Sequence, residues 1–334
     1  NNKTVFITGG AGSIGSELCR QSAKFKPKKI IIFDINENDS YFLKRELNEN
    51  FPELDVEVEI GSIRDSNKVL KSITNHQPDV IFHTAAHKHV PLMENNPEEA
   101  VKNNIFGTKN VIEAADENNV ERFILISTDK AVNPTNVMGA TKRVAEIIAQ
   151  SYSKKSNTKF MAVRFGNVLG SKGSVIPIFK KQIKDGGPIT VTHPKVKRYF
   201  MTIPEAAQLV IQSGAIGNGG EVFILDMGEP VKIIELARDL IKLSGYQEGV
   251  DINIEITGLR PGEKMYEEIL LDTEDDISTE HEKIYISNLS CIDEDNFLKH
   301  IDKLNKLANN MDKENVIKVL QKLVPEYKPK NNIH

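Results

Sequence analysis

The chain has 334 residues, of which 39% are hydrophobic and 27% are charged, with 43 basic and 47 acidic side chains. This composition is typical of a globular protein of about two domains, and it excludes a disordered or fibrous chain. The formal net charge of −4 lacks the basic excess of nucleic-acid-binding proteins, so no nucleic-acid partner is expected.

Segment length and cysteine usage indicate the compartment. The uncharged run over 206–220 has only 15 residues and contains four amide or hydroxyl side chains, which excludes a bilayer-spanning helix there. Cys19 and Cys291 cannot form a disulfide framework, which favours a reducing compartment. We therefore expect a cytoplasmic chain that makes no membrane contact of its own.

From its first residues the sequence alternates β-branched runs with helical segments. Strands are predicted over 3–8, 29–34, 55–60, 79–84, 122–127 and 159–165. The run over 29–34 is almost continuously apolar, as in a strand that is buried on both faces. A helix is predicted over 13–25, and another opens at Asn96-Pro97 and continues with apolar residues at helical spacing to Ile112. Six such units predict an α/β protein with a Rossmann-type, doubly wound parallel sheet.

The alternation ends at about residue 166. Residues 166–204 are rich in Gly, Pro and Lys, and short elements follow them: a strand over 222–226, a helix over 232–243 and a strand over 252–257. Two amphipathic helices close the chain, and we expect them to pack on the domain or on a neighbouring subunit. The predicted division is a nucleotide-binding Rossmann domain over 1–166, to which 203–228 returns, a smaller substrate-binding region over 167–290 and a helical tail over 291–334.

A glycine-rich segment, Thr8-Gly9-Gly10-Ala11-Gly12-Ser13-Ile14-Gly15, follows the first strand and opens the first helix. A dinucleotide needs glycine there for a tight turn and for close backbone approach to the pyrophosphate, which the helix N-terminus then binds. Asp34 ends the second strand, where its carboxylate suits the adenosine ribose, and its negative charge favours NAD over NADP. The alternative interpretation is a glycine turn with a helix-capping aspartate.

The spacing of Gly9, Gly12 and Gly15 resembles that of the extended short-chain dehydrogenases/reductases. This resemblance implies a catalytic Ser or Thr after the fifth strand and a Tyr-x-x-x-Lys motif on the next helix. Thr128-Asp129-Lys130 follows that strand, and Lys142 lies on the helix, but Met138 occupies the position of the tyrosine. Residues four apart share a helix face, so Met138 and Lys142 are expected side by side.

Five longer strings narrow the resemblance: 87–94 (HKHVPLME), 127–142, 164–168 (RFGNV), 173–177 (GSVIP) and 260–264 (RPGEK). They resemble the UDP-N-acetylglucosamine 4,6-dehydratases of bacterial polysaccharide biosynthesis, the group that includes PglF, WbpM and CapD, and the likeness covers about residues 3–275. Many members of that group carry methionine in place of the tyrosine. The resemblance implies a catalytic domain that is cytosolic and often follows an inner-membrane region.

The implied reaction forms UDP-4-keto-6-deoxy-N-acetylglucosamine for capsule, O-antigen or protein-glycan synthesis, with NAD regenerated in each turnover. Because Met138 has no titratable proton, we assign Asp129 to take the O4 proton and deliver it to the departing C6 oxygen. Lys130 would remove and return the C5 proton, which requires its pKa to fall by about 3 units from ~10.4. Thr128 is expected to hydrogen-bond near O4, and Lys142 to hold the nicotinamide ribose.

The remaining candidates are assigned to ligands by the same resemblance. The cofactor-binding candidates are Gly9, Gly12, Ser13, Ile14, Gly15, Asp34, Ser62, Ile63, Ala85, Ala86 and Lys142. The substrate-binding candidates are Lys88, His89, Asn167, Val175, Arg198, Arg260 and Glu263. The two arginines suit a diphosphate because a guanidinium grips two oxygens at once, and Glu263 suits the uridine ribose. A metal site among the histidines at 83–89 is not expected, because carboxylate ligands are sparse there.

Other functions stay open at this stage. We favour a dehydratase that retains the configuration at C5, and the alternatives are a dehydratase that inverts C5 and a C4 epimerase. The Asp129-Lys130 pair counts against the epimerase. A non-catalytic NAD-binding regulatory module is a further alternative, which the missing tyrosine supports. A homo-oligomer is expected by analogy.

Overall fold

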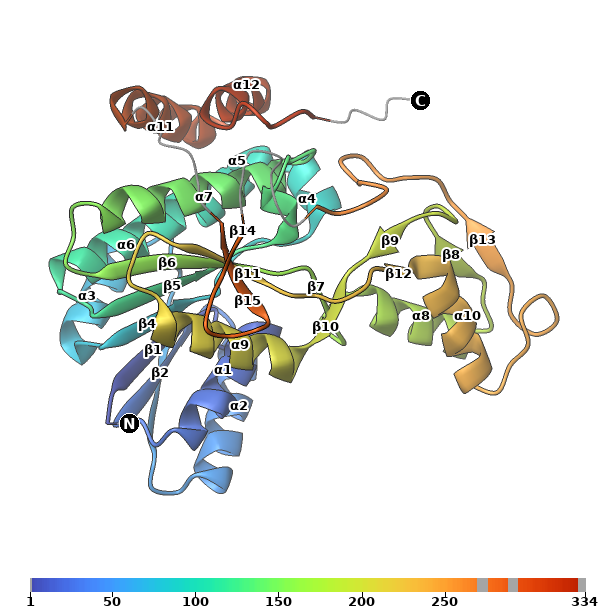
Figure 1. The fold of residues 1–334 in the computed structure, drawn as a ribbon, viewed down its shortest axis with the longest axis horizontal. Helices are drawn as coiled ribbons and strands as arrows, with labels where there is room; N and C mark the ends of the chain where they lie inside the picture. Colours follow the sequence, from blue (N-terminus) through green and yellow to red (C-terminus); the bar gives the residue numbers. More distant parts are fainter. Residues whose placement is uncertain (1, 269–275, 288–293, 330–334) are drawn as a thin grey trace.

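The computed structural model describes residues 2–268, 276–287 and 294–329. Its main sheet contains β1 (Thr4–Thr8), β2 (Lys29–Asp34), β3 (Asp55–Ile60), β4 (Val80–His83), β5 (Arg122–Ile126), β6 (Lys159–Arg164), β11 (Val222–Leu225), β14 (Asp276–Ser278) and β15 (Ile284–Ser287). The nine strands lie in the order β14-β15-β11-β6-β5-β4-β1-β2-β3 (Figure 1). β1 to β6 and β11 are parallel, and β14 and β15 add an antiparallel edge. The predicted α/β class with a parallel sheet is confirmed.

The strand order reverses at β1, which pairs with β2 on one side and β4 on the other. In open parallel sheets such a switch point forms a crevice at the carboxyl ends of the strands, where ligands bind. The glycine loop leaves β1 at this crevice. The fold therefore places the predicted cofactor segment where a dinucleotide site belongs.

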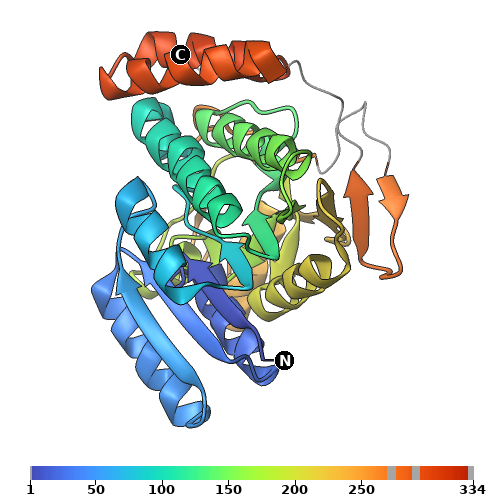
Figure 2. The same ribbon diagram turned by 90° about the vertical axis from the view of Figure 1, so that its left-hand side faces the viewer.

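Both faces of the sheet are covered by helices, which explains the apolar run in β2. Ile31 and Phe33 join one buried cluster, and Ile30 and Ile32 join the other. The first cluster is covered by α3 (Ser66–His76), α6 (Thr108–Glu117) and α7 (Val137–Ser153). The second is covered by α1 (Ser13–Lys24), α2 (Glu37–Asn50) and α9 (Ile203–Ile216), as Figures 1 and 2 show.

The helix expected to run on from Pro97 is not regular. After α4 (Val90–Asn95) and α5 (Pro97–Ala100), a π-helical segment occupies Val101–Gly107 before α6 begins. Within it Asn104 is fully buried, and its side chain accepts from the His87 N–H at 2.8 Å and donates to the His87 carbonyl at 2.9 Å and the Thr141 hydroxyl at 3.1 Å. The wider turn thus directs a polar side chain inward, where it joins the loop after β4 to α7.

A smaller lobe lies beside the sheet and holds a third buried cluster (Figure 1). Its elements are β7 (Asn167–Leu169), α8 (Val175–Lys184), β8 (Ile189–Val191), β9 (Lys197–Arg198), β10 (Phe200–Thr202), β12 (Val231–Lys232), α10 (Ile233–Leu243) and β13 (Ile254–Ile256). The strands form three separate pairs, β10-β7, β12-β9 and β13-β8. The division of the chain into domains stays a prediction, although β11 lies in the main sheet beside β6.

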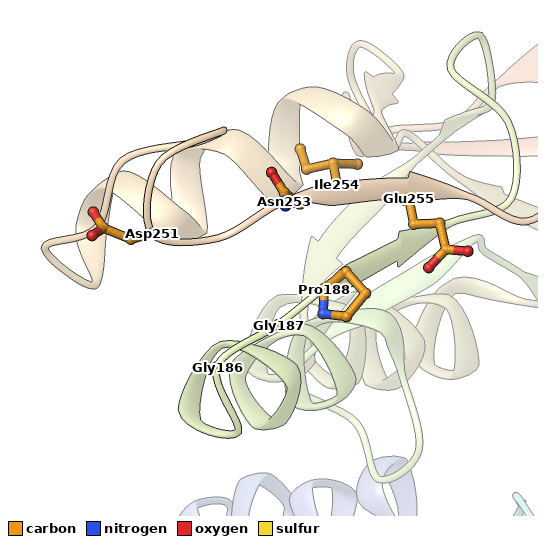
Figure 3. A pocket seen from close by; sticks show the side chains of 7 residues that line it. All are labelled: Gly186, Gly187, Pro188, Asp251, Asn253, Ile254 and Glu255. Atoms are coloured by element: carbon orange, nitrogen blue, oxygen red, sulfur yellow. The ribbon is translucent and has the colours of Figure 1, made fainter.

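A surface hollow of about 430 Å³ opens at the β8–β13 end of this lobe (Figure 3). It is lined by Gly186, Gly187, Pro188, Asp251, Asn253, Ile254 and Glu255. None of the candidate site residues is among them. The chemistry of the chain is therefore to be sought at the crevice of the main sheet.

Two helices of the predicted tail, α11 (Glu294–Asn309) and α12 (Lys313–Leu323), lie on the main body over α5, the π-helical segment and α7 (Figures 1 and 2). Their buried apolar side chains, such as Leu304 and Leu320, extend the first cluster. Cys291 and the tail residues 291–293 and 330–334 lie outside the described residues. Within the described ranges, no helix has the length and apolar character needed to cross a membrane.

Candidate active site

The glycine loop is packed so closely at the crevice that a side chain would not fit at two of its glycines. Gly9 has a φ of +63°, and a Cβ there would lie 2.7 Å from the backbone of Ala85. A Cβ on Gly15 would come within 2.2 Å of the Gly9 carbonyl oxygen, so α1 packs directly on the loop. α1 begins at Ser13, and no side chain caps its N-terminus. Free N–H groups at a helix start are the donors that a pyrophosphate accepts from, so the residues present fit a dinucleotide.

Asp34 holds the glycine loop against β2. Its Oδ2 accepts from the Ala11 N–H at 2.9 Å, and its Oδ1 accepts from the Asn36 N–H at 2.9 Å. The cap of α2 is Asn36, whose side chain accepts from the Asp39 N–H. The helix-capping alternative for Asp34 is therefore wrong, while its role toward an adenosine ribose stays a prediction.

The loop after β4 borders the other side of the glycine loop. The Thr84 hydroxyl donates to the carbonyls of Thr8 and Gly9 at 2.8 and 3.0 Å, which brings Ala85 and the following Ala86 beside the glycines. Ser62 and Ile63 follow β3; Ile63 is buried against Gly107, and the Ser62 hydroxyl accepts from the Arg64 N–H at 3.2 Å. The cofactor-binding candidates thus lie along one edge of the sheet.

A strap from the smaller lobe, residues 170–174, crosses this crevice. The Lys172 N–H donates to the Ser13 hydroxyl at 3.2 Å, and its Nζ lies 2.5 Å from Asp39 Oδ2. On the other side, Lys88 Nζ donates to the Lys172 carbonyl at 3.0 Å. His89 lies against Gly173, where a Cβ would meet its ring at 2.7 Å. Lys88 and His89 therefore lie between the cofactor loop and the smaller lobe, while their role toward a substrate stays a prediction.

His83 at the end of β4 is held by two hydroxyls. Its Nδ1 lies 2.7 Å from Thr8 Oγ1, and its Nε2 lies 2.9 Å from Thr108 Oγ1. Burial lowers the pKa of His83 to about 3, and the nearby Lys142 acts in the same direction. The ring is therefore neutral at physiological pH. Through its two nitrogens, the ring joins β4 to Thr8 of β1 and to Thr108 of α6.

The predicted catalytic turn follows β5 and is a short 3-10 helix over Asp129–Ala131. Asp129 is fully buried, and its Oδ1 accepts from the Thr128 hydroxyl at 2.8 Å and from Lys130 Nζ at 2.9 Å. Its Oδ2 is buried without a hydrogen-bond partner. That oxygen lies beneath Gly166, where a Cβ would come within 3.2 Å of it. Asp129 therefore keeps one acceptor oxygen unused.

A third charged group, Glu267, completes this turn, and the sequence analysis missed it. Its side chain is 3% exposed, and its Oε1 lies 3.6 Å from Lys130 Nζ. Burial works to lower the pKa of Lys130, but the carboxylates of Asp129 and Glu267 outweigh it and raise the pKa above its ordinary value. The expected lowering of this pKa is therefore wrong for the ligand-free protein, because the charges nearest to the amine are negative.

α7 carries Met138 and Lys142, four residues apart, beside the turn. Asn136 caps this helix by accepting from the Gly139 N–H at 2.8 Å. Met138 is 4% exposed and belongs to the apolar cluster under the sheet. Burial lowers the pKa of Lys142 to about 8, although Glu146 acts against the change. A Cβ on Gly139 would lie 2.0 Å from the Lys130 carbonyl oxygen, so the helix touches the catalytic turn there.

A buried ion network fixes the same helix to the sheet. Arg164 at the end of β6 donates to both oxygens of Glu146 at 2.8 Å, Ser127 donates at 2.6 Å and Arg143 at 3.1 Å. Burial alone would raise the pKa of Glu146, but Arg164, Arg143 and the Ser127 hydroxyl outweigh it and lower the pKa to about 2. Since Ser127 precedes Thr128, this network sets the position of the catalytic turn relative to Lys142.

The Arg260–Lys264 turn docks on the N-terminus of α7. The Gly262 carbonyl accepts from the Thr135 hydroxyl at 2.8 Å and from Asn136 Nδ2 at 3.2 Å. Lys264 Nζ donates to the Val132 carbonyl at 3.0 Å. This turn therefore joins the substrate-binding candidates rigidly to the catalytic helix.

The substrate-binding candidates of this region contact one another. Glu263 Oε1 lies 3.0 Å from Arg198 Nη2 and accepts from the Thr192 hydroxyl at 3.0 Å. Arg198 is 9% exposed, and its Nε lies 3.6 Å from Glu267 Oε1. Arg260 is exposed beside them. The Arg198 guanidinium thus connects Glu263 to the group at Lys130.

Asn167 and Val175 lie at the entrance to the smaller lobe. Asn167 Nδ2 donates to the Tyr199 carbonyl at 3.2 Å, and Val175 is the first residue of α8. Neither contributes to the charged group around Lys130. Their roles toward a diphosphate and a uracil stay predictions.

Comparison with known proteins agrees with this geometry. The family described as "Polysaccharide biosynthesis protein" matches residues 5–289. The chain belongs to this family. It is 53% identical over 322 residues to the capsular polysaccharide biosynthesis protein CapD of Staphylococcus aureus, covering 95% of this chain, and it spans about half of CapD's own length (53%). The family part of the predicted resemblance is confirmed.

Two further proteins match over most of their length. A UDP-N-acetylglucosamine 4,6-dehydratase (inverting) of Campylobacter jejuni is 34% identical over 315 residues, which cover 93% of this chain and 88% of that protein. The X-ray structure of Pen from Bacillus thuringiensis superposes with a TM-score of 0.79 at 37% identity, covering 93% of this chain and 99% of that one. The chain therefore shares its overall fold with Pen.

Gly139→Ala is expected to destabilise the fold by about 1–3 kcal/mol, because the added methyl meets a backbone oxygen that cannot rotate away. Urea unfolding measures the loss. Ser151→Ala, further along α7 and half-buried, is the control and should change the free energy of unfolding by less than ~0.5 kcal/mol. Equal stability of the two variants would contradict the close contact at Lys130.

Glu146→Gln is expected to change how stability depends on pH. The folded-state pKa of Glu146 lies below its ordinary value, so its ionised form stabilises the fold above pH ~4.5, and this contribution is lost as the pH falls to about 2. Between pH 4.5 and about 2, the free energy of unfolding of the wild type should fall by up to about 3 kcal/mol more than that of the variant. Urea unfolding at a series of pH values measures the difference, with Glu255→Gln on exposed β13 as control. Parallel curves for wild type and Glu146→Gln would refute the assignment.

Proposed function

We propose that the chain is the catalytic part of an NAD-dependent UDP-N-acetylglucosamine 4,6-dehydratase that retains the configuration at C5. The observation that carries the proposal is the buried Asp129–Lys130 pair, 2.9 Å apart, at the mouth of a dinucleotide crevice. The name of the Campylobacter relative supports the substrate and the reaction class. The names of the family and of CapD support a place in capsule or other polysaccharide synthesis.

The crevice suits NAD as the cofactor. Bound NAD supplies a reversible acceptor for the hydrogen at C4 and returns that hydrogen to C6. The bare backbone of the glycine loop and the uncapped start of α1 are placed to hold its pyrophosphate, and Asp34 its adenosine ribose. Lys142, which is buried on α7, is placed for the nicotinamide ribose.

Asp129 moves one proton between two substrate oxygens. Its Oδ1 is already engaged by Thr128 and Lys130, so Oδ2 is the oxygen left to accept the O4 proton. The same carboxyl then delivers that proton to the C6 oxygen, which departs as water. Met138 has no proton to give or take. Because the Asp129 carboxylate serves both oxygens, the reaction does not need a second acid–base group at position 138.

Lys130 removes the C5 proton and returns it. A single amine that takes the proton from one face of the sugar and gives it back to that face retains the configuration at C5. Inversion needs a second donor on the opposite face, and Met138 supplies none. At the nucleotide end of the substrate, Arg198 and Arg260 would bind the diphosphate, and Glu263 would bind the uridine ribose. The proposed assembly is a homo-oligomer.

Conversion of UDP-N-acetylglucosamine by the purified chain, with NAD⁺ supplied, tests the proposal. We expect a product lighter by one water, with a methyl group at C6. In D₂O the product should carry deuterium at C5. In H₂O the NMR cross-relaxation between H3 and H5 of the product distinguishes retention from inversion. A product of unchanged mass with inverted C4 would identify an epimerase, and retention of NAD without turnover would identify a binding module.

Two substitutions separate the proposed roles. Asp129→Asn should lower turnover by about 10²–10⁴-fold, because the proton carrier between O4 and O6 is lost. Lys130→Met should stop deuterium incorporation at C5. The matched control is Asp251→Asn, at the distant hollow, which should turn over like the wild type. Wild-type turnover in Asp129→Asn would show that another group carries the O4 proton.

A further inference from the structure

Glu267 is a buried carboxylate to which the proposed mechanism assigns no role. It follows the Arg260–Lys264 turn, and its Oε1 lies 3.6 Å from Lys130 Nζ and 3.6 Å from Arg198 Nε. Its Oε2 is buried and has no hydrogen-bond partner. Buried polar atoms in native proteins are nearly always paired, so an unpaired carboxylate oxygen next to a reacting amine calls for an explanation.

The proposed reaction also contains an unsolved proton problem. In the ligand-free protein Lys130 is an ammonium group, since its nearest neighbours are the carboxylates of Asp129 and Glu267. An ammonium group cannot take a proton from C5. Its extra proton must move to a neighbouring base before that step. Asp129 is not available, because it already holds the O4 proton at that stage.

We infer that Glu267 is a positioning residue for Lys130, which holds the amine at the crevice and takes its extra proton for the C5 step. The inference rests on the proposed function. The ammonium of Lys130 gives one proton to the Glu267 carboxylate, which leaves a neutral amine and a neutral carboxylic acid. The amine then takes the C5 proton and later returns it to C5. Finally the carboxylic acid returns its proton to the amine, so no proton is gained or lost in the cycle.

The charges around Glu267 are compatible with this exchange. Lys130 and Asp129 face it from the catalytic turn, Arg198 from β9 and Lys264 from its own segment. Burial raises the pKa of Glu267; Lys130, Arg198 and Lys264 oppose the change, and Asp129 adds to it. The net direction is upward, toward the protonated carboxylic acid that the exchange requires. Lys130 Nζ and Glu267 Oε1 lie 3.6 Å apart, and they exchange the proton once the two groups move within hydrogen-bonding distance.

Arg198 gives Glu267 a fixed place. Its Nη2 lies 3.0 Å from Glu263 Oε1 while its Nε faces Glu267 Oε1 at 3.6 Å. One guanidinium thus spans a substrate-binding candidate and the partner of Lys130. A substrate that binds at Glu263 is in this way connected, through Arg198 and Glu267, to the position of Lys130.

The test compares Glu267→Gln and Glu267→Asp with the wild type, using UDP-N-acetylglucosamine and its C5-deuterated form. For Glu267→Gln we expect kcat to fall at least tenfold, with KM changed less than twofold. We also expect a larger C5 isotope effect on kcat than in the wild type, because the C5 step becomes slower than the others. Activity of this variant should rise with pH more steeply than that of the wild type, because only solvent is then left to take the proton of Lys130. Glu267→Asp should restore part of kcat.

The matched control is Glu255→Gln, which makes the same change at an exposed residue of β13 and should keep the wild-type isotope effect and pH profile. A wild-type isotope effect and pH profile in Glu267→Gln, or a faster C5 step, would overturn the inference. If Glu267→Gln does not fold, Glu267→Asp decides by the same two readouts. A wild type that removes no water would overturn the proposed function itself, whereas normal dehydration beside an unaffected Glu267→Gln overturns this inference alone.

Discussion

The site depends on keeping one ion pair, Asp129 with Lys130, away from water. Moving a carboxylate and an ammonium group out of water costs several kcal/mol for each ion, unless neighbouring groups replace the lost hydration. Thr128 and Glu267 supply part of that replacement. The replacement is incomplete, since one oxygen of Asp129 and one of Glu267 stay unpaired.

The topology of the sheet brings this pair together with distant parts of the chain. The catalytic turn follows β5, Arg164 ends β6, and both lie at the carboxyl edge of parallel strands. The Arg260–Lys264 turn reaches the same edge from the smaller lobe, because the Gly262 carbonyl docks on the N-terminus of α7. A contact of Gly139 with the Lys130 carbonyl completes the arrangement. Contacts between side chains and the backbone therefore help to fix where the charges meet.

Sequence patterns predicted the scaffold well and the electrostatics poorly. The bounds of β2 and β3 agree with the predicted ranges, because an apolar or alternating run bounded by polar residues has few other solutions. The π-helical segment was missed because apolar spacing does not distinguish it from a regular helix until Asn104 is seen to be buried. Asp129, Lys130 and Lys142 were assigned from the family resemblance, by their places after β5 and on α7. The lowered pKa that the reaction requires of Lys130 differs from the raised pKa in the structure, because the neighbouring Asp129 raises it and Glu267 adds to this effect from a remote segment without a periodic pattern.

The strap over residues 170–174 affects how ligands enter and leave the crevice. Its contacts with Ser13, Asp39 and Lys88 are largely exposed to solvent, and such contacts contribute about 1 kcal/mol or less apiece. Together they hold the strap over the crevice with a free energy of only a few kcal/mol. A conformational difference of that size leaves an open form populated at roughly 0.1–10%. Ligands can thus enter and leave through a minor population of the folded protein, without unfolding of either lobe.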